Sequence, residues 1–372
     1  MIYADNAATT KLDIDAFEAM KPYFFDRYGN ASQPYSFSST AKKALKAARE
    51  TIAECIGASP EEIYFTSGGT ESNNWAIKGS LAHDDIRAII TSKFEHHSIL
   101  LACERIEKLG YPVAYIHPTK YGFVTPDILK NSITNKTKLV SVMMVNNEIG
   151  TVQPIKELCV IAHRYGAIFH TDAVQAVGHI KIDVQELGVD LLSCSAHKFN
   201  GPKGIGFLYV RNGTKLSAYV DGGAQEFGMR AGTENVAYIV GMATALKKNI
   251  MAIEKSQIHL RELEQIILEA LSNAQIDYIR NGNEPYIPGN LSLSFKGFEG
   301  EMLLHRLDLM GIMVSTGSAC DSKNTQISHV LQAIEATGNY ALGTIRISLS
   351  RENTKEEAAK IAESLIKIMS ER

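Results

Sequence analysis

Short apolar runs alternate with amphipathic stretches through most of the chain before residue 210. The runs are rich in Val and Ile and have the length of strands, and the stretches between them carry apolar residues at helical spacing. Strands interleaved with helices form a largely parallel sheet covered on both faces, so we predict an α/β fold. The predicted strands are 62–66, 88–91, 112–116, 139–145, 168–171, 190–195 and 205–210, and the predicted helices are 38–56, 99–109 and 155–165.

Helical patterns also occur nearer both ends of the chain. Asp13 or Asp15 can cap a first helix that reaches Asp26. The spacing from 233 to 273 is helical, and we expect its first half to begin the link to a second, smaller α+β unit. Thr354 and Glu357 form a capping box before a closing amphipathic helix. The smaller unit has predicted strands at 287–295, 312–315 and 344–350 and a predicted helix at 299–309.

Polar residues follow four of the predicted strands, at the points where those strands end. Because the carboxyl ends of parallel strands meet at one edge of a sheet, we expect these residues to share a pocket. The four groups are Glu95 to His97, Asn146 to Glu148, His170 to Gln175, and Ser195 to Lys198.

Lys198 lies where an apolar strand gives way to a glycine-rich loop, directly after His197. Partial desolvation at such a position would lower the pKa of the amine and allow it to act as a nucleophile or base. Schiff-base chemistry needs such a lysine. Lys203, between Pro202 and Gly204, is the competing candidate, but we expect it in solvent. Taken alone, Lys198 would more simply be a surface loop lysine.

A second candidate motif is T-S-G-G-T-E, between a short strand and a helix that opens near Thr70 or Glu71. Backbone amides at a helix start, with glycines that permit close approach, can bind an anion. Many strand-to-helix turns hold Gly-Gly-Thr and bind nothing, so this motif alone is a weak signal.

Composition excludes several function classes. The net charge of −3 over 372 residues does not suggest a nucleic-acid partner. The first residues lack the basic and apolar regions of a secretory signal, and no apolar run suggests a membrane span. Five cysteines without a C-x-x-C pair predict neither a disulfide framework nor a zinc site. Cys320 alone lies in a run of small loop residues, which indicates one reactive thiol in a cytoplasmic protein, whereas we expect the other four to be small buried hydrophobes.

Nine motifs in order resemble those of the cysteine desulfurases, which are pyridoxal-phosphate enzymes of the class V aminotransferase group. The resemblance is to the type that supplies sulfur for iron-sulfur clusters. The motifs are D-N-A-A-T-T, T-S-G-G-T-E-S-N-N, E-H-H, V-N-N-E-I-G, H-T-D-A-V-Q, S-A-H-K-F-N-G-P-K-G, M-R-A-G-T-E-N, S-T-G-S-A-C and I-R-I-S-L-S. The resemblance implies a fold-type-I homodimer with a mostly parallel seven-stranded sheet. Its large domain would be 15–255, and 1–14 plus 256–372 would form the small domain that carries the Cys320 loop.

The resemblance also implies roles for the cofactor site. Lys198 resembles the Schiff-base lysine that later moves the substrate Cα proton, and Asp172 the carboxylate that pairs with the pyridine nitrogen and keeps the ring an electron sink. His96 resembles the imidazole stacked on the ring, which could shuttle protons. Gln175 resembles the donor to the ring hydroxyl. The implied phosphate site consists of Gly69, Thr70, Ser195 and His197, with Thr233 contributed by the second subunit.

For the substrate L-cysteine, Arg346 resembles the carboxylate-binding residue, assisted by Asn147. Arg351 could replace it by sequence alone, but we expect Arg351 to face solvent. Cys320 resembles the nucleophile that becomes a persulfide and passes sulfur to an acceptor protein, and it could transiently ligate an iron-sulfur cluster on that partner. Three histidines have no matched role and are expected to be ordinary hydrogen-bonded residues: His97, His163 and His170.

The chain departs from the family pattern in two places. Ala224 and Phe227 stand where relatives usually have a third glycine and an arginine. The chain also ends soon after its last predicted helix, whereas members that serve cluster assembly often extend further to dock a scaffold protein, so an iron-sulfur scaffold and a thiolation carrier both stay open as acceptors. The alternative activities are a selenocysteine lyase or another class V enzyme, and the alternative from another class is a non-catalytic interaction protein.

Overall fold

The computed structural model describes residues 1–81, 86–316, 327–336 and 338–371. Its main element is a seven-stranded sheet of order β2-β8-β7-β6-β5-β3-β4. β8 is antiparallel to both of its neighbours, and the other neighbouring strands are parallel, which confirms the predicted α/β fold. The strands are β2 (Ile63–Thr66), β3 (Ala88–Ser92), β4 (Val113–Ile116), β5 (Thr137–Ser141), β6 (Ile168–Asp172), β7 (Leu191–Ser195) and β8 (Gly206–Val210).

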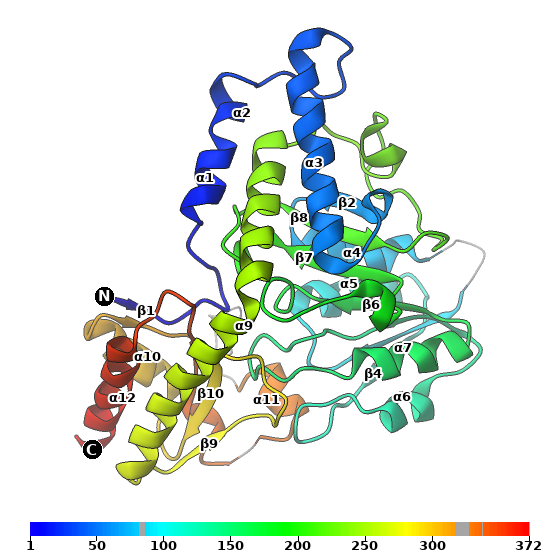
Figure 1. Ribbon diagram of the computed structural model, residues 1–372. Coiled ribbons are helices and arrows are strands. Elements are labelled where there is room, and N and C mark those ends of the chain that lie inside the picture. Colours follow the sequence, from blue (N-terminus) through cyan, green and yellow to red (C-terminus); the bar gives the residue numbers. More distant parts are fainter. Residues whose placement is uncertain (82–85, 317–326, 337, 372) are drawn as a thin grey trace.

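Helices cover both faces of this sheet (Figure 1). Successive strand residues point to opposite faces. Leu191 of β7 therefore joins a core with α4 and α5, while Leu192 joins a separate core with α3 and α7. Burial on both faces explains why the central strands read as continuous apolar runs. The covering helices are α3 (Ser39–Ile56), α4 (Gly69–Gly79), α5 (His97–Glu107), α6 (Pro126–Ser132), α7 (Ile155–Arg164) and α8 (Val184–Leu187).

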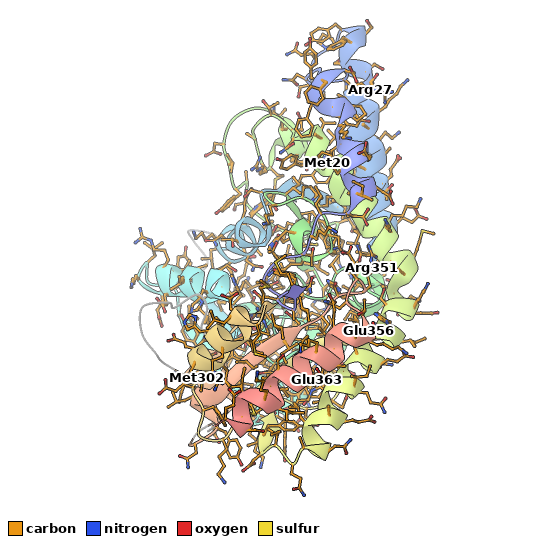
Figure 2. All side chains as sticks on the ribbon, turned by 90° about the vertical axis from the view of Figure 1, so that its left-hand side faces the viewer. Met20, Arg27, Met302, Arg351, Glu356 and Glu363 are labelled. Carbon is orange, nitrogen blue, oxygen red and sulfur yellow. The ribbon has the colours of Figure 1, made fainter. Side chains whose placement is uncertain are left out.

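The first predicted helix is two helices, α1 (Ile14–Met20) and α2 (Pro22–Phe25). Asp13 caps α1 by accepting the Asp15 amide at 2.8 Å, one of the two predicted caps. The prediction of one helix to Asp26 was wrong because Pro22 has no amide hydrogen and its ring interferes with the preceding turn. Together with the first turns of α3, these helices project from the body of the protein, and Arg27 lies near the tip of this projection (Figures 1 and 2).

The predicted link is part of one 38-residue helix, α9 (Val236–Asn273), capped by the side chain of Asn235. By length and composition it is the one helix in the described ranges that could cross a membrane. We had expected no such segment from the sequence. It packs against α1, α3 and α12 along its length, and 44% of that apolar stretch is buried inside the protein. These contacts are those of a core helix.

A smaller unit surrounds the second half of α9 and holds a three-stranded antiparallel sheet of order β12-β10-β9. α12 lies beside α9, with Glu356 and Glu363 on its outer face (Figure 2). The elements are β9 (Tyr278–Arg280), β10 (Asn290–Phe295), α10 (Gly300–Leu309), α11 (His329–Ala333), β12 (Thr344–Ser348), α12 (Lys355–Ser370) and the parallel pair β1 (Ile2–Tyr3) and β11 (Ile312–Met313). Short 3-10 helices lie at Ser36–Ser38, Pro60–Glu62, Ala196–Lys198, Gln225–Gly228 and Ala341–Gly343.

The domain division after residues 14 and 255 stays a prediction. The buried side chains agree with it, since Ile239 and Met242 of α9 belong to the core of the large sheet, whereas Leu263 and Ile267 belong to the core of the smaller unit. The pairing of β1 with β11 likewise joins the start of the chain to the smaller unit.

Candidate active site

A cavity of about 620 Å³ lies at the carboxyl ends of the central strands. Its size is typical of a small-molecule site. We call it the Lys198 cavity. The predicted shared pocket therefore exists, and ten of the twelve predicted site residues line it: Gly69, Thr70, His96, Asn147, Asp172, Gln175, Ser195, His197, Lys198 and Arg346.

Strand ends place the most important of these side chains. Asp172 is the last residue of β6 and Ser195 the last of β7, and these strands are parallel neighbours. Lys198 follows on the short 3-10 helix after β7. His96 is the N-cap of α5. The chain thus brings an amine, a carboxylate and an imidazole to one edge of the sheet.

The amine of Lys198 points to the N-terminal segment of the chain. Its Nζ donates to the carbonyl oxygens of Ala7 at 2.6 Å and Ala8 at 2.8 Å. Gln175 also donates to the Ala7 carbonyl, at 2.9 Å. Lys203, the competing lysine, is exposed at the cavity rim, as expected.

Asp172 is a buried acceptor at the cavity wall. Its Oδ2 accepts from the Asn73 side chain at 2.6 Å, and its Oδ1 accepts from the Val174 amide at 3.0 Å. No helix begins at Ala173, so Asp172 does not serve as a helix cap.

The start of α4 forms another wall of the cavity. Its N-cap, Gly68, has φ of +144° and supplies no side-chain cap, which leaves the first amides of the helix without a capping side chain. A Cβ at Gly69 would lie 2.6 Å from Val174 Cγ2, so any side chain at this position would clash with Val174. Such a helix start suits an anion.

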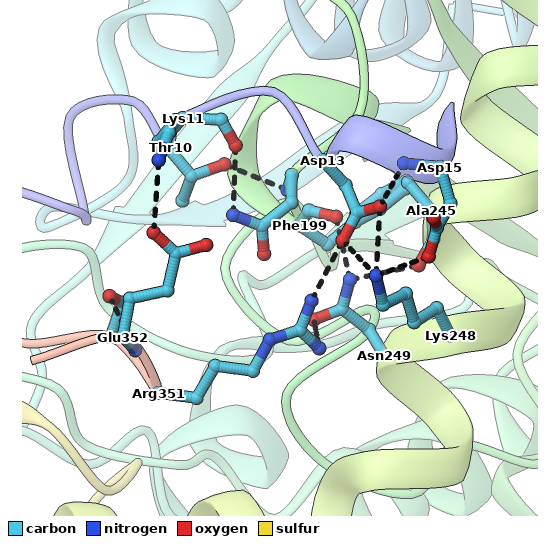
Figure 3. Close-up of polar contacts among 12 residues, drawn as sticks. Thr10, Lys11, Asp13, Asp15, Phe199, Ala245, Lys248, Asn249, Arg351 and Glu352 are labelled. Atoms are coloured by element: carbon cyan, nitrogen blue, oxygen red, sulfur yellow. Dashed lines mark hydrogen bonds and ion pairs between the residues drawn. The ribbon is translucent and has the colours of Figure 1, made fainter. Parts of the chain in front are cut away.

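Arg346 enters the cavity from β12 of the smaller unit. One guanidinium nitrogen lies 2.7 Å from Asp5 Oδ1 and another donates to the Asn147 carbonyl at 2.8 Å. We expected the alternative, Arg351, to face solvent, and this prediction was wrong. Arg351 is half-buried away from the cavity, where it contacts Asp13 at 3.3 Å within the polar cluster of Figure 3.

Burial favours the neutral form of two cavity histidines by lowering their pKa. It lowers the pKa of His197 to about 4, assisted by Lys198 and Lys203. It also lowers the pKa of His96, with Lys198 and His97 acting in the same direction and Asp172 opposing. A neutral imidazole can accept or donate one hydrogen bond at each nitrogen, so the tautomer decides its chemistry.

The three unmatched histidines have ordinary partners. His170 lies between the hydroxyls of Ser141 and Ser193, and burial lowers its pKa to about 3. His163 contacts Asp190 at 2.8 Å, a bond that raises the pKa of His163 to about 10. His97 packs on the ring of His329, with 4.7 Å between their centres.

Among the described residues that were predicted for the site, Thr233 alone does not line the Lys198 cavity. Thr233 is exposed and lines a hollow of about 200 Å³ that shares Ser67 and Gly204 with the cavity. Cys320 lies outside the described residues. Thr316, the last described residue before it, lines the cavity.

Sequence reasoning missed four side chains of the site: Asp5, Glu71, Asn73 and Ser98. Glu71 holds the M-R-A-G-T segment through Arg230, with 2.8 Å between Nε and Oε1. Asp5, Glu71 and Asn73 lay inside motifs already singled out, but spacing could not show that Asp5 bonds to Arg346, Glu71 to Arg230 and Asn73 to Asp172. Ser98, two residues after His96, had no signal of its own.

Comparison with known proteins gives the class of the chain. The family model described as aminotransferase class-V matches residues 2–361, and the chain belongs to that family. Within this class it is a member of the cysteine desulfurases. It is 48% identical over 359 residues to "Cysteine desulfurase IscS" of Dictyoglomus turgidum, a match that covers 96% of this chain and 91% of the relative.

Solved structures agree with this assignment. A "NifS-like protein" superposes with a TM-score of 0.94 at 35% identity, with 100% of both chains covered. "SspA in complex with cysteine" superposes with a TM-score of 0.84 at 35% identity, covering 95% of this chain and 100% of that one. With its mostly parallel seven-stranded sheet, the protein has the predicted fold of the fold-type-I enzymes.

The family implies pyridoxal 5′-phosphate, and the residues of the cavity fit this group. The uncapped start of α4 suits its phosphate, and the short distance between Gly69 and Val174 leaves room only for backbone at residue 69. Asp172 supplies a buried carboxylate. Lys198 supplies an amine at the same cavity.

Proposed function

We propose that this protein is a pyridoxal-phosphate-dependent cysteine desulfurase that converts L-cysteine to L-alanine and captures the sulfur as a persulfide on Cys320. The observation that carries the proposal is the meeting of Lys198, Asp172 and Arg346 in one cavity. The name of the cysteine-bound structural relative supports L-cysteine as the substrate.

In this proposal each residue of the cavity has one task toward the cofactor. The amide of Gly69, together with Thr70, Ser195 and His197, would hold the phosphate. Asp172 would pair with the pyridine nitrogen, Gln175 would donate to the ring hydroxyl, and His96 would stack on the ring. When bound, pyridoxal phosphate supplies an electron sink that lets the substrate Cα lose its proton.

The substrate is held by groups from the other side of the cavity. Arg346 binds the carboxylate of L-cysteine through its planar guanidinium, and Asn147 assists. The Lys198 amine then moves the proton at Cα, because an amine in a partly buried site can lose its own proton and act as a base.

Sulfur leaves the substrate by attack of the Cys320 thiolate. The substrate Cβ–S bond breaks, a new S–S bond forms, and the electron pair left at Cβ takes a proton, so the products are L-alanine and the Cys320 persulfide. Two of the described cysteines do not suit this task, because burial raises the pKa of Cys55 to about 11 and that of Cys103 to about 12. All four described thiols are free, which supports the proposed cytoplasmic location.

A homodimer is part of the proposal. Thr233 lies outside the Lys198 cavity of its own chain, which suits a phosphate contact made in a second copy. The projecting helices also expose a group of aromatic side chains that a second copy would cover: Phe24, Phe25, Tyr28, Tyr35 and Phe37. The persulfide would pass to an acceptor protein such as an iron-sulfur scaffold or a thiolation carrier, where Cys320 could briefly ligate a cluster.

The test is an assay of alanine formation with L-cysteine, with L-selenocysteine, and with an amino acid plus a keto acid acceptor. We expect L-cysteine to give alanine and a persulfide on Cys320. Cys320→Ala should keep the cofactor absorbance and lose alanine formation from cysteine. Undiminished turnover by Cys320→Ala would exclude this nucleophile, preference for selenocysteine would indicate a lyase, and absence of any reaction would favour an interaction protein.

A further inference from the structure

Asn73, on α4, bonds to two partners, one at the end of β6 and one in the first turn of α5. Its Nδ2 donates to Asp172 Oδ2 at 2.6 Å and to Ser98 Oγ at 2.8 Å. The side chain is 1% exposed. Its orientation is fixed by charge, because a carboxylate only accepts hydrogen bonds and a rotated amide would place Oδ1 against Asp172. Oδ1 itself has no hydrogen-bond partner in the described part of the chain.

Ser98 continues this chain of hydrogen bonds to His96. Its backbone amide donates to His96 Nδ1 at 3.1 Å, and its hydroxyl lies 2.8 Å from the same nitrogen. A backbone amide can only donate, so Nδ1 must carry the lone pair and the proton must lie on Nε2. Because the hydroxyl already accepts from Asn73, its own hydrogen is available for Nδ1.

We infer that Asn73 and Ser98 are positioning residues that link Asp172 to His96 and hold His96 as the Nε2–H tautomer, so that His96 acts in the cavity as a hydrogen-bond donor and not as a base. The inference rests on the proposed function only for what these side chains contact when pyridoxal phosphate is bound. The hydrogen bonds belong to the protein alone.

The tautomer limits what His96 can do. Nδ1 is occupied by two donors at the start of α5, so Nε2 is the nitrogen left for a ligand in the cavity. A neutral ring with its proton on Nε2 can polarise or orient a ligand atom but cannot take a proton there. Burial, which favours the neutral ring, acts in the same direction as the neighbouring charge of Lys198. Proton transfer at the substrate is therefore left to Lys198.

The experiment reads the tautomer directly in the protein without cofactor. Long-range ¹H–¹⁵N spectra of histidine-labelled protein distinguish a protonated from an unprotonated ring nitrogen, and His96→Gln assigns the resonances. Near neutral pH we expect His96 Nε2 to be protonated and Nδ1 to be unprotonated and hydrogen-bonded. A spectrum with the proton on Nδ1, or on both nitrogens, would overturn the inference.

Variants then test the link through Asn73. Ser98→Ala removes the hydroxyl, and Asn73→Asp turns the isosteric donor into an acceptor that draws the Ser98 hydroxyl away from His96. Both changes should shift the Nδ1 resonance in the same direction, and the double variant should match Ser98→Ala alone, because the two act through one bond. Ser98→Thr keeps a hydroxyl at this position and should give the same His96 Nδ1 resonance as the wild type. Ser364→Ala, which removes a buried hydroxyl that has no partner among the described residues, should change nothing.

Additive shifts in the double variant, or an unchanged Nδ1 resonance in Asn73→Asp, would show that Asn73 does not act through Ser98. A second readout is the dissociation constant of pyridoxal phosphate, which we expect to rise about tenfold or more in Asn73→Asp, since hydrogen bonds to charged groups are among the strong ones. If wild-type protein fails to bind pyridoxal phosphate, the proposed function is wrong. The tautomer of His96 and its dependence on Ser98 are then still tested by the spectra, which are recorded without cofactor.

Discussion

Arg346 and Asp5 form an ion pair of 2.7 Å across the Lys198 cavity, although 341 positions separate them in the chain. The Arg346 side chain is 8% exposed and that of Asp5 20%. If Arg346 binds the substrate carboxylate as proposed, that carboxylate meets a guanidinium that already has one anionic partner. The pair also joins the first residues of the chain to the smaller unit.

Asp5→Asn removes the competing charge and keeps the shape of the side chain. We expect KM for L-cysteine to fall about fivefold, because the positive potential of Arg346 is then less compensated. The same change should lower the free energy of unfolding by about 1–3 kcal/mol, since a buried charge loses its partner. Steady-state kinetics and urea unfolding measure the two effects, and a raised KM would show that Asp5 orients Arg346 for the substrate.

Arg346→Lys should raise KM for L-cysteine by about 10-fold to 100-fold, with a smaller effect on kcat. A lysine keeps the charge but loses the planar pair of donors that fits a carboxylate. The matched control is Arg351→Lys, because Arg351 lies outside the cavity and contacts Asp13 and Asn249. Equal effects of the two substitutions on KM would remove Arg346 from the substrate site.

Glu95 predicts a pH dependence of stability. It is fully buried and accepts from Ser92 Oγ at 2.5 Å and from the Met143 amide, and burial raises its pKa to about 8. The folded protein therefore keeps a proton that the unfolded chain has lost above about pH 4.5. Its stabilising contribution is fully present below about pH 4.5 and is lost as the pH rises through about 8.

Glu95→Gln removes this titration. Between those pH values the free energy of unfolding of the wild type should fall relative to the variant by about 1.4 kcal/mol per pH unit. Urea unfolding at a series of pH values measures the difference, and the exposed Glu50→Gln is the control. Parallel curves for wild type and Glu95→Gln would mean that Glu95 is ionised in the folded protein throughout.

The segment with unusual residues at Ala224 and Phe227 depends on a buried ion pair. The Glu226 carboxylate accepts hydrogen bonds from the two terminal guanidinium nitrogens of Arg49, at 2.6 and 2.8 Å, and from the Phe65 amide at 2.8 Å. Glu226 and Phe227 have φ of +47° and +58°, a left-handed conformation that L-residues rarely adopt, so these contacts hold an unfavourable backbone.

Glu226→Ala should lower the free energy of unfolding by about 3–5 kcal/mol, because Arg49 would stay buried without its partner. Glu50→Ala breaks the exposed pair with Lys46 on the same helix and should cost less than about 1 kcal/mol. Thermal or urea unfolding compares the two variants. Similar losses would indicate that the Arg49 pair is hydrated and contributes little.

The sequence predicted the alternation of strands and helices and the grouping of polar residues at strand ends because both depend on short-range patterns. The helical spacing from 233 to 273 likewise predicted the extent of α9, whereas the break before Pro22 was not predicted. The partners of predicted site residues, such as Asn73 for Asp172 and Asp5 for Arg346, depend on which distant segments meet. Local spacing carries no information on such contacts, and only the three-dimensional arrangement supplies it.

The central claim is that the Lys198 cavity binds pyridoxal phosphate through Lys198. Its most direct test is borohydride reduction of the protein loaded with pyridoxal phosphate, followed by peptide mapping by mass spectrometry, with Lys198→Ala and the rim variant Lys203→Ala in parallel. The account predicts cofactor fixed on Lys198 in the wild type and in Lys203→Ala, and none in Lys198→Ala. Fixation on another lysine, or unchanged fixation in Lys198→Ala, would contradict it.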